Sequence, residues 1–337
     1  MKEAQAKVIL LLSGVAASLF LLEGAAFLLN SVLELKHGMV SPGIAGNAAL
    51  EYPTLFMKDS DLFWKMAPST GETNSEGFRD RAFAPEKEAG VFRIVCMGDS
   101  VTFGWPTPID ETYPNVLERV MGERFAGKKI EVINAGVPGY TSFQGLMLLE
   151  KKILGYRPDL LIVYYGINDR AGAYRQDKEA PRAPRWLAEA ENFLYRFQFY
   201  KFFNRVALRL RYPPGNIMAV SRVSPYNYYR DLKLIASRAA ERGIGALFVV
   251  RPAFYDRRTG EVFTDARYVP PRDIWQIDAC AFFQGLKSQA GACFSDDTQP
   301  YNFHLTQEGH RLFSGEILAC LTQNDAFAAR VSGGKAP

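Results

Sequence analysis

From Val91 onward, short apolar runs alternate with helix-length segments, and this alternation constrains the fold more than any other feature of the chain. Strands that alternate with helices predict right-handed βαβ units and a parallel sheet covered by helices on both faces. We expect strands at residues 93–98, 130–135, 160–165 and 246–251, with a weaker one near 292–295. We expect helices at residues 113–125, 142–154, 225–242, 273–288 and 306–322. The sequence therefore predicts the α/β fold class.

The first expected strand ends in Gly98-Asp99-Ser100, and a short polar patch closed by Gly104 follows it. Open α/β sheets bind ligands at the carboxyl ends of their strands, so Ser100 would lie where a nucleophile can meet a substrate. The same tripeptide also occurs in ordinary turns, because Asp and Ser both favour turns and helix N-caps. It differs from the Gly-x-Ser-x-Gly elbow of α/β-hydrolases, since residue 102 is Thr. Ser100 is a candidate nucleophile only together with the motifs downstream.

Three further motifs follow in chain order, at residues 134–140, 165–169 and 304–310. The first two come directly after expected strands and would lie beside Ser100 at the same edge of the sheet. Acyl transfer needs hydrogen-bond donors aimed at a developing oxyanion. A glycine such as Gly136 lets a backbone N–H approach a substrate closely, and the Asn168 side chain offers a second donor.

Over roughly residues 91–325, the four motifs resemble the SGNH hydrolase superfamily of GDSL esterases and lipases. The matching residues are Gly98, Asp99, Ser100, Gly104, Gly136, Gly166, Ile167, Asn168, Asp169, His304, Leu305 and Gly309. The resemblance implies a flavodoxin-like three-layer α/β/α sandwich with a parallel sheet and a serine esterase that uses no metal or organic cofactor. It also implies that Ser100 attacks the acyl carbonyl and His304 acts as general base. The Ser100 and Gly136 N–H groups and the Asn168 side chain would form the oxyanion hole.

The third member of the triad departs from the family pattern, which places Asp three residues before the histidine. That position is Tyr301 here, so the acid must come from elsewhere. We expect Asp297 to orient His304, with Asp296 as second choice and a Ser100–His304 dyad held by a backbone carbonyl as third. We expect His310, the competing histidine, one or two turns into the last helix and facing away.

The N-terminal segment predicts a membrane anchor. Residues 8–22 carry no charge, and the apolar character resumes after Glu23 and continues to Leu29. A helix of these 22 residues would measure roughly 33 Å, enough to cross a bilayer core. Lys2 and Lys7 precede it and favour a cytoplasmic N-terminus. The competing interpretation is a signal peptide cleaved near residues 24–26. We expect an uncleaved inner-membrane helix, with Glu23 near the outer interface and the catalytic domain on the periplasmic side.

We divide the chain into an anchor at 1–36, a linker at 37–90, the hydrolase-like domain at 91–325 and a flexible tail at 326–337. The anchor, the linker and the domain together also resemble membrane-anchored bacterial members of the superfamily. An insertion at 181–212 interrupts the domain and carries many aromatic residues, with seven basic residues against two acidic ones. It would either pack its aromatic side chains on the core or lie against anionic lipid as an interfacial segment.

The net charge of +4 is small and dispersed, and the Cys and His spacing matches no zinc motif, so nucleic-acid binding and a metal site are not expected. Cys280 and Cys293 close a short loop and could form a disulfide in an oxidising compartment. Cys96 lies in the expected core strand and reads as a small buried hydrophobe.

Two other functions remain compatible with the sequence. An O-acyltransferase would use the same site but pass the acyl group to a glycan hydroxyl instead of water. A non-catalytic anchored scaffold would keep the fold with an inactive site. The natural ester, on a lipid or an O-acetylated glycan, is not readable from the motifs.

Overall fold

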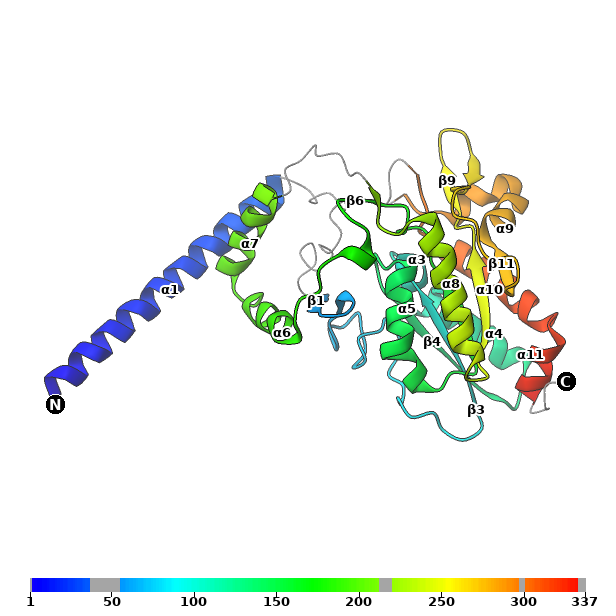
Figure 1. Ribbon diagram of the computed structural model, residues 1–337, viewed down its shortest axis with the longest axis horizontal. Coiled ribbons are helices and arrows are strands. Elements are labelled where there is room, and N and C mark those ends of the chain that lie inside the picture. Colours follow the sequence, from blue (N-terminus) through cyan, green and yellow to red (C-terminus); the bar gives the residue numbers. More distant parts are fainter. Residues whose placement is uncertain (1, 37–54, 212–219, 297–300, 333–337) are drawn as a thin grey trace. The chain divides into compact units, whose positions relative to one another are not determined.

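The computed structural model describes residues 2–36, 55–211, 220–296 and 301–332, which divide into two compact units (Figure 1). Unit 1 comprises Met1–Trp64 and Pro181–Met218, and unit 2 comprises Lys65–Ala180 and Ala219–Pro337. The insertion at 181–212 therefore belongs with the N-terminal helix. Residues 65–90, which we expected to be linker, belong instead with the α/β domain in unit 2.

Unit 2 is built on a five-stranded sheet in which every neighbouring pair is parallel. Its strands are β3 (Val91–Gly98), β4 (Lys129–Gly136), β5 (Leu160–Tyr164), β8 (Gly245–Val250) and β11 (Gln276–Asp278). They lie in the order β4-β3-β5-β8-β11. Counted along the chain, this is the 2-1-3-4-5 order of flavodoxin-like sheets, in which ligands bind where the order reverses. The predicted α/β fold with a parallel sheet is confirmed.

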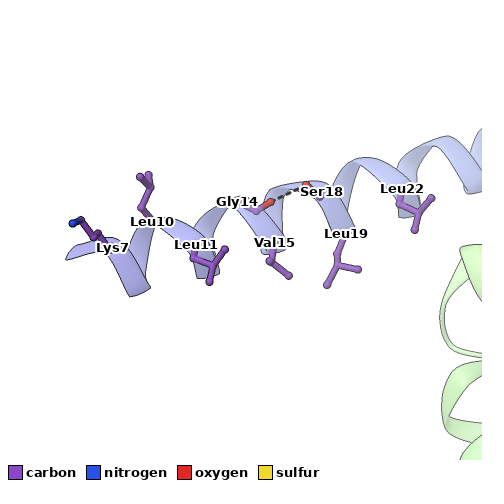
Figure 2. Close-up of a pocket in the computed structure, with 8 residues that line it drawn as sticks. All are labelled: Lys7, Leu10, Leu11, Gly14, Val15, Ser18, Leu19 and Leu22. Atoms are coloured by element: carbon purple, nitrogen blue, oxygen red, sulfur yellow. Dashed lines mark hydrogen bonds between the residues drawn. The ribbon is translucent and has the colours of Figure 1, made fainter. Parts of the chain in front are cut away.

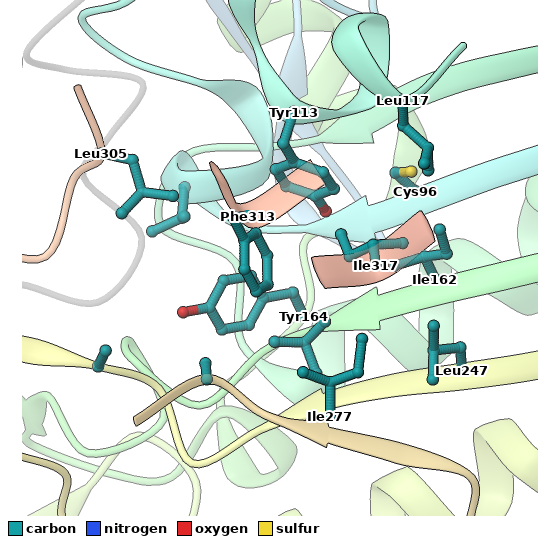
Figure 3. Close-up of a cluster of buried hydrophobic side chains, with 14 of the residues drawn as sticks. Cys96, Tyr113, Leu117, Ile162, Tyr164, Leu247, Ile277, Leu305, Phe313 and Ile317 are labelled. Atoms are coloured by element: carbon teal, nitrogen blue, oxygen red, sulfur yellow. The ribbon is translucent and has the colours of Figure 1, made fainter. Parts of the chain in front are cut away.

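Helices cover both faces of this sheet (Figure 1). One face carries α4 (Tyr113–Arg124), α10 (Gln307–Thr322) and α11 (Asp325–Ser332), and the other carries α5 (Ser142–Lys151) and α8 (Pro225–Ala240). Side chains of α4 and α10 pack on alternate residues of the strands, as Figure 3 shows for Tyr113, Leu117, Phe313, Ile317, Cys96, Ile162 and Leu247. Burial on both faces explains why the strands read as continuous apolar runs.

The fifth strand differs from the prediction. Residues 292–295 add no strand to the sheet, and Phe294 forms only an isolated bridge with Leu305. The fifth strand is β11, within the segment 273–288 that we expected to be helical. The helix α9 (Ala279–Gly285) begins only after β11, because the Asp278 side chain accepts a hydrogen bond from the Ala281 N–H and caps it.

The remaining elements of the described chain are short. Three two-stranded sheets pair β1 (Phe56–Asp59) with β2 (Phe63–Met66), β6 (Gly172–Ala173) with β7 (Val220–Ser221), and β9 (Phe254–Asp256) with β10 (Glu261–Phe263). Short helices are α3 (Ser100–Phe103), η1 (Ile109–Glu111), η2 (Ile153–Tyr156), η3 (Asp177–Glu179) and η4 (Lys287–Cys293).

Unit 1 contains α1 (Lys2–Lys36), α6 (Arg185–Leu194) and α7 (Gln198–Arg211). Within the described residues, α1 is the one helix long and apolar enough to cross a membrane. Every side chain from residue 3 to residue 22 is exposed, and Figure 2 shows Leu11, Val15, Leu19 and Leu22 projecting from one side of the helix. At about 1.5 Å per residue, this bare part of α1 is about 30 Å long, the thickness of a bilayer core.

The bare part of α1 ends at Glu23, where α1 begins to contact α7. The Glu23 carboxylate accepts the backbone N–H groups of Gln198, at 2.6 Å, and Phe199, at 3.1 Å. These are two of the N–H groups that the first turn of a helix leaves without a partner. About two turns further along the same face of α1, Asn30 is buried, and its side chain donates to the Gln198 carbonyl at 3.0 Å. The Glu23 carboxylate is thus satisfied by α7, while Phe27, Leu28 and Leu29 on the rest of α1 stay exposed.

Candidate active site

Ser100 is the first residue of α3 and follows β3 directly. Asp99 caps this short helix, since its carboxylate accepts the Val101 N–H at 2.9 Å. No described residue accepts a hydrogen bond from the Ser100 N–H, which belongs to the first turn of α3. The Ser100 Oγ lies 2.7 Å from His304 Nε2. The structure therefore brings together the two residues that the sequence placed 204 positions apart.

His304 is carried by an extended segment that is held by β9 on one side and by Phe294 and Ser295 on the other. Asn302 exchanges both backbone hydrogen bonds with Tyr255, at 2.7 and 3.0 Å, and the Ser295 N–H donates to the His304 carbonyl at 2.9 Å. The Phe303 ring packs against the imidazole, with 4.6 Å between the ring centroids. Thr306 then caps α10 two residues later. The imidazole is therefore positioned by backbone pairing on both sides and by an aromatic neighbour.

Asn168 lies after β5, and its side chain is oriented by two acceptors. Its Nδ2 donates to the Asp99 carboxylate and to the Tyr140 carbonyl, each at 3.1 Å. Because a side-chain amide carries two N–H groups, Asn168 must release one of these bonds before it can donate to a substrate oxygen. Burial raises the pKa of Asp99 to about 7, and the hydrogen bonds from Val101 and Asn168 act in the opposite direction.

Gly136 does not occupy the position that the sequence suggested. It is buried at the end of β4, and its N–H donates to the Asn134 side chain at 3.0 Å. A Cβ on Gly136 would lie 2.2 Å from the backbone nitrogen of Phe103, so this glycine lets β4 pack under α3. The expectation that Gly136 lines an oxyanion hole is therefore wrong on geometry, because its N–H is already engaged inside the protein.

Gly139 is the glycine that the sequence analysis missed. It is half-exposed in the turn after β4, with φ of +80°, next to the Tyr140 carbonyl that holds Asn168. No described residue accepts a hydrogen bond from its N–H. A positive φ costs glycine little, which explains the residue type. The dipeptide Pro138-Gly139, which is typical of turns, was the signal in the sequence. It lies a few residues after the expected strand at 130–135.

A buried polar network holds the loops that carry Asn168 and Gly139. Asp169 is fully buried and accepts the Ser142 N–H and hydroxyl, the latter at 2.5 Å. Burial raises the pKa of Asp169 to about 7, against the lowering effect of the Ser142 hydrogen bonds. Arg222 pairs with Asp177 at 2.9 Å and donates to the Gly139 carbonyl at 2.6 Å. The turn at Gly139 is thus held by a hydrogen bond to the buried ion pair of Arg222 and Asp177.

A second support holds α3 from the chain segment before β3. Arg79 donates to the carbonyls of Phe103 and Gly104 at 3.2 and 3.1 Å. The neighbouring Asp80 accepts the Asn134 N–H of β4 at 2.8 Å, and burial raises the pKa of this carboxyl to about 7. The segment that we expected to be linker thus contributes directly to the position of Ser100.

Of the two carboxylates expected to orient His304, Asp297 lies outside the described residues. Asp296, the second choice, is exposed and forms an ion pair with Arg257. Tyr301 turns its ring onto Phe263, with 4.9 Å between centroids. The Asp296 and Tyr301 side chains therefore contact Arg257 and Phe263, and neither is paired with the His304 imidazole.

His310 is structural. It lies in the first turns of α10, is fully buried, and its Nδ1 accepts the Tyr113 N–H at 3.2 Å. Burial lowers the pKa of His310 to about 3, so the ring stays neutral. His310 accordingly serves the contact between α10 and α4.

The predicted disulfide between Cys280 and Cys293 is not formed, and both residues are buried free thiols. The chain between them folds into α9 and η4 instead of turning back as a loop, so the two residues stand at opposite ends of a helical segment. Burial raises the pKa of both thiols, to about 11 for Cys293. Among the residues described, no cluster of three or more His, Cys, Asp or Glu side chains could hold a metal ion.

Comparison with known proteins adds a family. The profile of the GDSL-like lipase/acylhydrolase family matches residues 96–312. An arylesterase from Vibrio mimicus is 31% identical over 77 residues, which are 23% of this chain and 38% of the arylesterase. The chain thus aligns with little more than a third of that relative's length.

Two solved structures align with part of this chain. A lipase/acylhydrolase from Enterococcus faecalis aligns with a TM-score of 0.45 and 17% identity, over 68% of this chain and 95% of that one. An acetylxylan esterase from Geobacillus stearothermophilus aligns with a TM-score of 0.44 and 15% identity, over 68% and 93%. At these values the two structures carry no argument about the substrate of this chain.

Replacement of Gly136 by Ala tests its structural role. We expect Gly136→Ala to lower the free energy of unfolding by about 3 kcal/mol, because the added Cβ meets fixed backbone atoms and overpacks the contact between β4 and α3. Gly122→Ala is the matched control, since a Cβ on this glycine in the last turn of α4 would have nothing within 4 Å. Chemical unfolding of the detergent-solubilised chain measures both. If Gly136→Ala kept its stability but lost its activity, the result would contradict the structural role and support Gly136 as an oxyanion-hole residue.

Proposed function

Because the chain belongs to the GDSL-like lipase/acylhydrolase family, we propose that it hydrolyses an acyl ester with Ser100 as nucleophile and His304 as general base. The observation that carries this proposal is the distance of 2.7 Å between Ser100 Oγ and His304 Nε2. A nucleophile and a base at this separation can exchange a proton as the nucleophile attacks. The placement of Ser100 after β3, where the strand order reverses, supports the same role.

The proposed reaction has two steps. The Ser100 Oγ attacks the acyl carbonyl while its proton moves to His304 Nε2, and the imidazolium then gives this proton to the leaving alcohol. Water next attacks the acyl-enzyme, losing a proton to His304. The imidazolium returns this proton to the Ser100 Oγ as its bond to the acyl carbon breaks and the acid leaves. In both steps the substrate oxygen becomes negatively charged and needs donors already in place. We assign this to the N–H groups of Ser100 and Gly139 and to the Asn168 side chain.

Asp297 remains our proposed third member of the triad. A general-base imidazole needs an acceptor for its Nδ1–H, which fixes the tautomer and stabilises the imidazolium. Asp296 is engaged by Arg257 on the surface, and Tyr301 packs on Phe263, which supports the choice of the next carboxylate along the chain.

We also propose that residues 8–29 anchor the protein in the inner membrane, with the hydrolase domain on the periplasmic side. The exposed apolar surface of α1 supports the anchor, and Lys2 and Lys7 in its first turns support this orientation. The contact of Glu23 with α7 supports a position for α6 and α7 at the outer interface. Trp186, Phe193 and Phe203 of these helices are more than half exposed, as expected of an interfacial segment. The ester would then be a lipid or an O-acetylated glycan within reach of the membrane.

The catalytic assignment is tested with p-nitrophenyl acetate, a phenyl ester chosen because the matching relative is an arylesterase. Ser100→Ala should abolish hydrolysis, and Asn168→Ala should lower kcat by about 10²- to 10³-fold, as loss of one oxyanion donor does. Ser237→Ala, an exposed serine on α8, is the matched control and should keep wild-type turnover. Turnover that survives in Ser100→Ala would exclude Ser100 as the nucleophile.

The acid is tested by two neighbouring substitutions. Asp297→Asn should lower kcat by roughly 10⁴-fold, the cost of a lost triad aspartate in serine proteases. Asp296→Asn, which removes only an exposed ion pair, should lower kcat less than tenfold. If neither substitution has an effect, His304 works without a carboxylate and the dyad is the better account.

Lipid contact by α6 is tested by fluorescence of the full chain in anionic bilayers that contain brominated lipid. Trp186 is 68% exposed, so bromine in the interface should quench its emission. The quenching should disappear in Trp186→Phe and persist in Trp105→Phe, which alters a tryptophan of unit 2. Equal quenching in both variants would argue that α6 lies away from lipid.

A further inference from the structure

Arg170 is a half-buried cation without a hydrogen-bond acceptor. It follows Asn168 and Asp169, and its guanidinium carbon lies 4.0 Å from the centre of the Phe254 ring. Among the residues that the structure describes, no carboxylate or carbonyl accepts a hydrogen bond from it. A guanidinium carries five N–H donors in a planar fork, and partial burial without acceptors costs free energy. Arg170 is therefore prepared for an acceptor that the protein itself does not provide.

The arginines around it are paired, which makes this one distinct. Arg258 pairs with Asp256, Arg257 with Asp296, and Arg267 with Asp265. Asp265 is near enough to raise the pKa of Arg170, but its two carboxylate oxygens are hydrogen-bonded to Arg267 at 2.6 and 3.0 Å. Burial acts in the opposite direction and is the largest influence on Arg170. The nearby carboxylates are thus already engaged and leave the guanidinium available.

Arg170 lies in the loop that carries Asn168. Its backbone belongs to the turn closed by the hydrogen bond from the Ala171 N–H to the Asn168 carbonyl, at 3.1 Å. The Phe254 ring under its guanidinium packs on Phe303, with 5.9 Å between centroids, and Phe303 packs on His304. Arg170 thus shares its loop with the proposed oxyanion donor Asn168. Its guanidinium lies on the Phe254 ring, which packs on Phe303, the ring that contacts His304.

We propose that Arg170 binds an oxyanion, a carboxylate or a phosphate, carried by the ester substrate close to its scissile bond. The inference rests on the proposed hydrolase function and adds a substrate class to it. An arginine fork matches the two oxygens of such a group and binds them with parallel hydrogen bonds. The Phe254 ring holds the guanidinium by a cation–π contact and limits its motion, so the fork is oriented before the substrate arrives.

Three acetate esters test the proposal on the full-length protein in detergent. Phenyl acetate is the neutral ester, and 4-acetoxybenzoate and 4-acetoxyphenyl phosphate carry a carboxylate and a phosphate. The wild type should prefer the charged esters in kcat/KM. Arg170→Gln should lower this charged-to-neutral ratio by about 10- to 100-fold, mostly through KM, because a charged hydrogen bond to the bound substrate is lost. Arg170→Lys should restore part of the ratio.

Arg258→Gln is the matched control, because it removes an exposed arginine that is paired with Asp256 and leaves the Arg267–Asp265 pair intact. It should leave the charged-to-neutral ratio at the wild-type value. An equal loss of activity on all three esters in Arg170→Gln would show a structural role and overturn the proposal. A wild type that cleaves phenyl acetate without any preference for the charged esters would overturn it as well. Absence of Ser100-dependent hydrolysis of any ester would overturn the hydrolase function itself.

Discussion

The register of β3 between its two neighbours determines where every functional residue lies. Gly98, the last residue of β3, is paired with Gly136 of β4 on one side and Tyr164 of β5 on the other. The three strands therefore end at the same level, and the loops that follow them carry Ser100, Gly139 and Asn168. Since the strand order reverses here, the loops separate enough to leave room for a ligand. A slip of one residue would turn each strand's side chains to the opposite face and break this arrangement.

Charged groups taken out of water hold this edge of the sheet together. Asp99, Asp169 and Asp80 are all buried, and each accepts hydrogen bonds from a neighbouring loop or strand. Burying a carboxylate costs free energy unless its oxygens accept hydrogen bonds. The loops that donate these hydrogen bonds are therefore confined to one arrangement. Arg93 acts in the same way at the opposite end of β3, where it is buried, pairs with Glu131 and donates to three carbonyls. The catalytic loops are therefore fixed by polar contacts over an apolar sheet.

Local patterns were sufficient for the α/β class and for four of the five strands of the sheet, and short motifs singled out Ser100 and His304, because this information is carried within a few residues. Gly136 and Gly139 could not be separated in the same way. The two stand three residues apart, and only the contact of Asn134 with the Gly136 N–H shows which one is engaged. The strand β11 was hidden because it is three residues long and runs directly into a helix. Arg170 could not be recognised as unpaired, since its neighbours Phe254 and Asp265 are distant in sequence.

The central claim is that Ser100 is a nucleophile activated by His304. The most direct measurement is covalent labelling of the intact protein with a fluorophosphonate, followed by peptide mass spectrometry. The account predicts a single adduct on Ser100 and a strongly reduced labelling rate in His304→Ala, whereas His310→Ala, if it folds, should label like the wild type. An adduct on another serine, no adduct, or labelling of Ser100 at the same rate without His304 would contradict it.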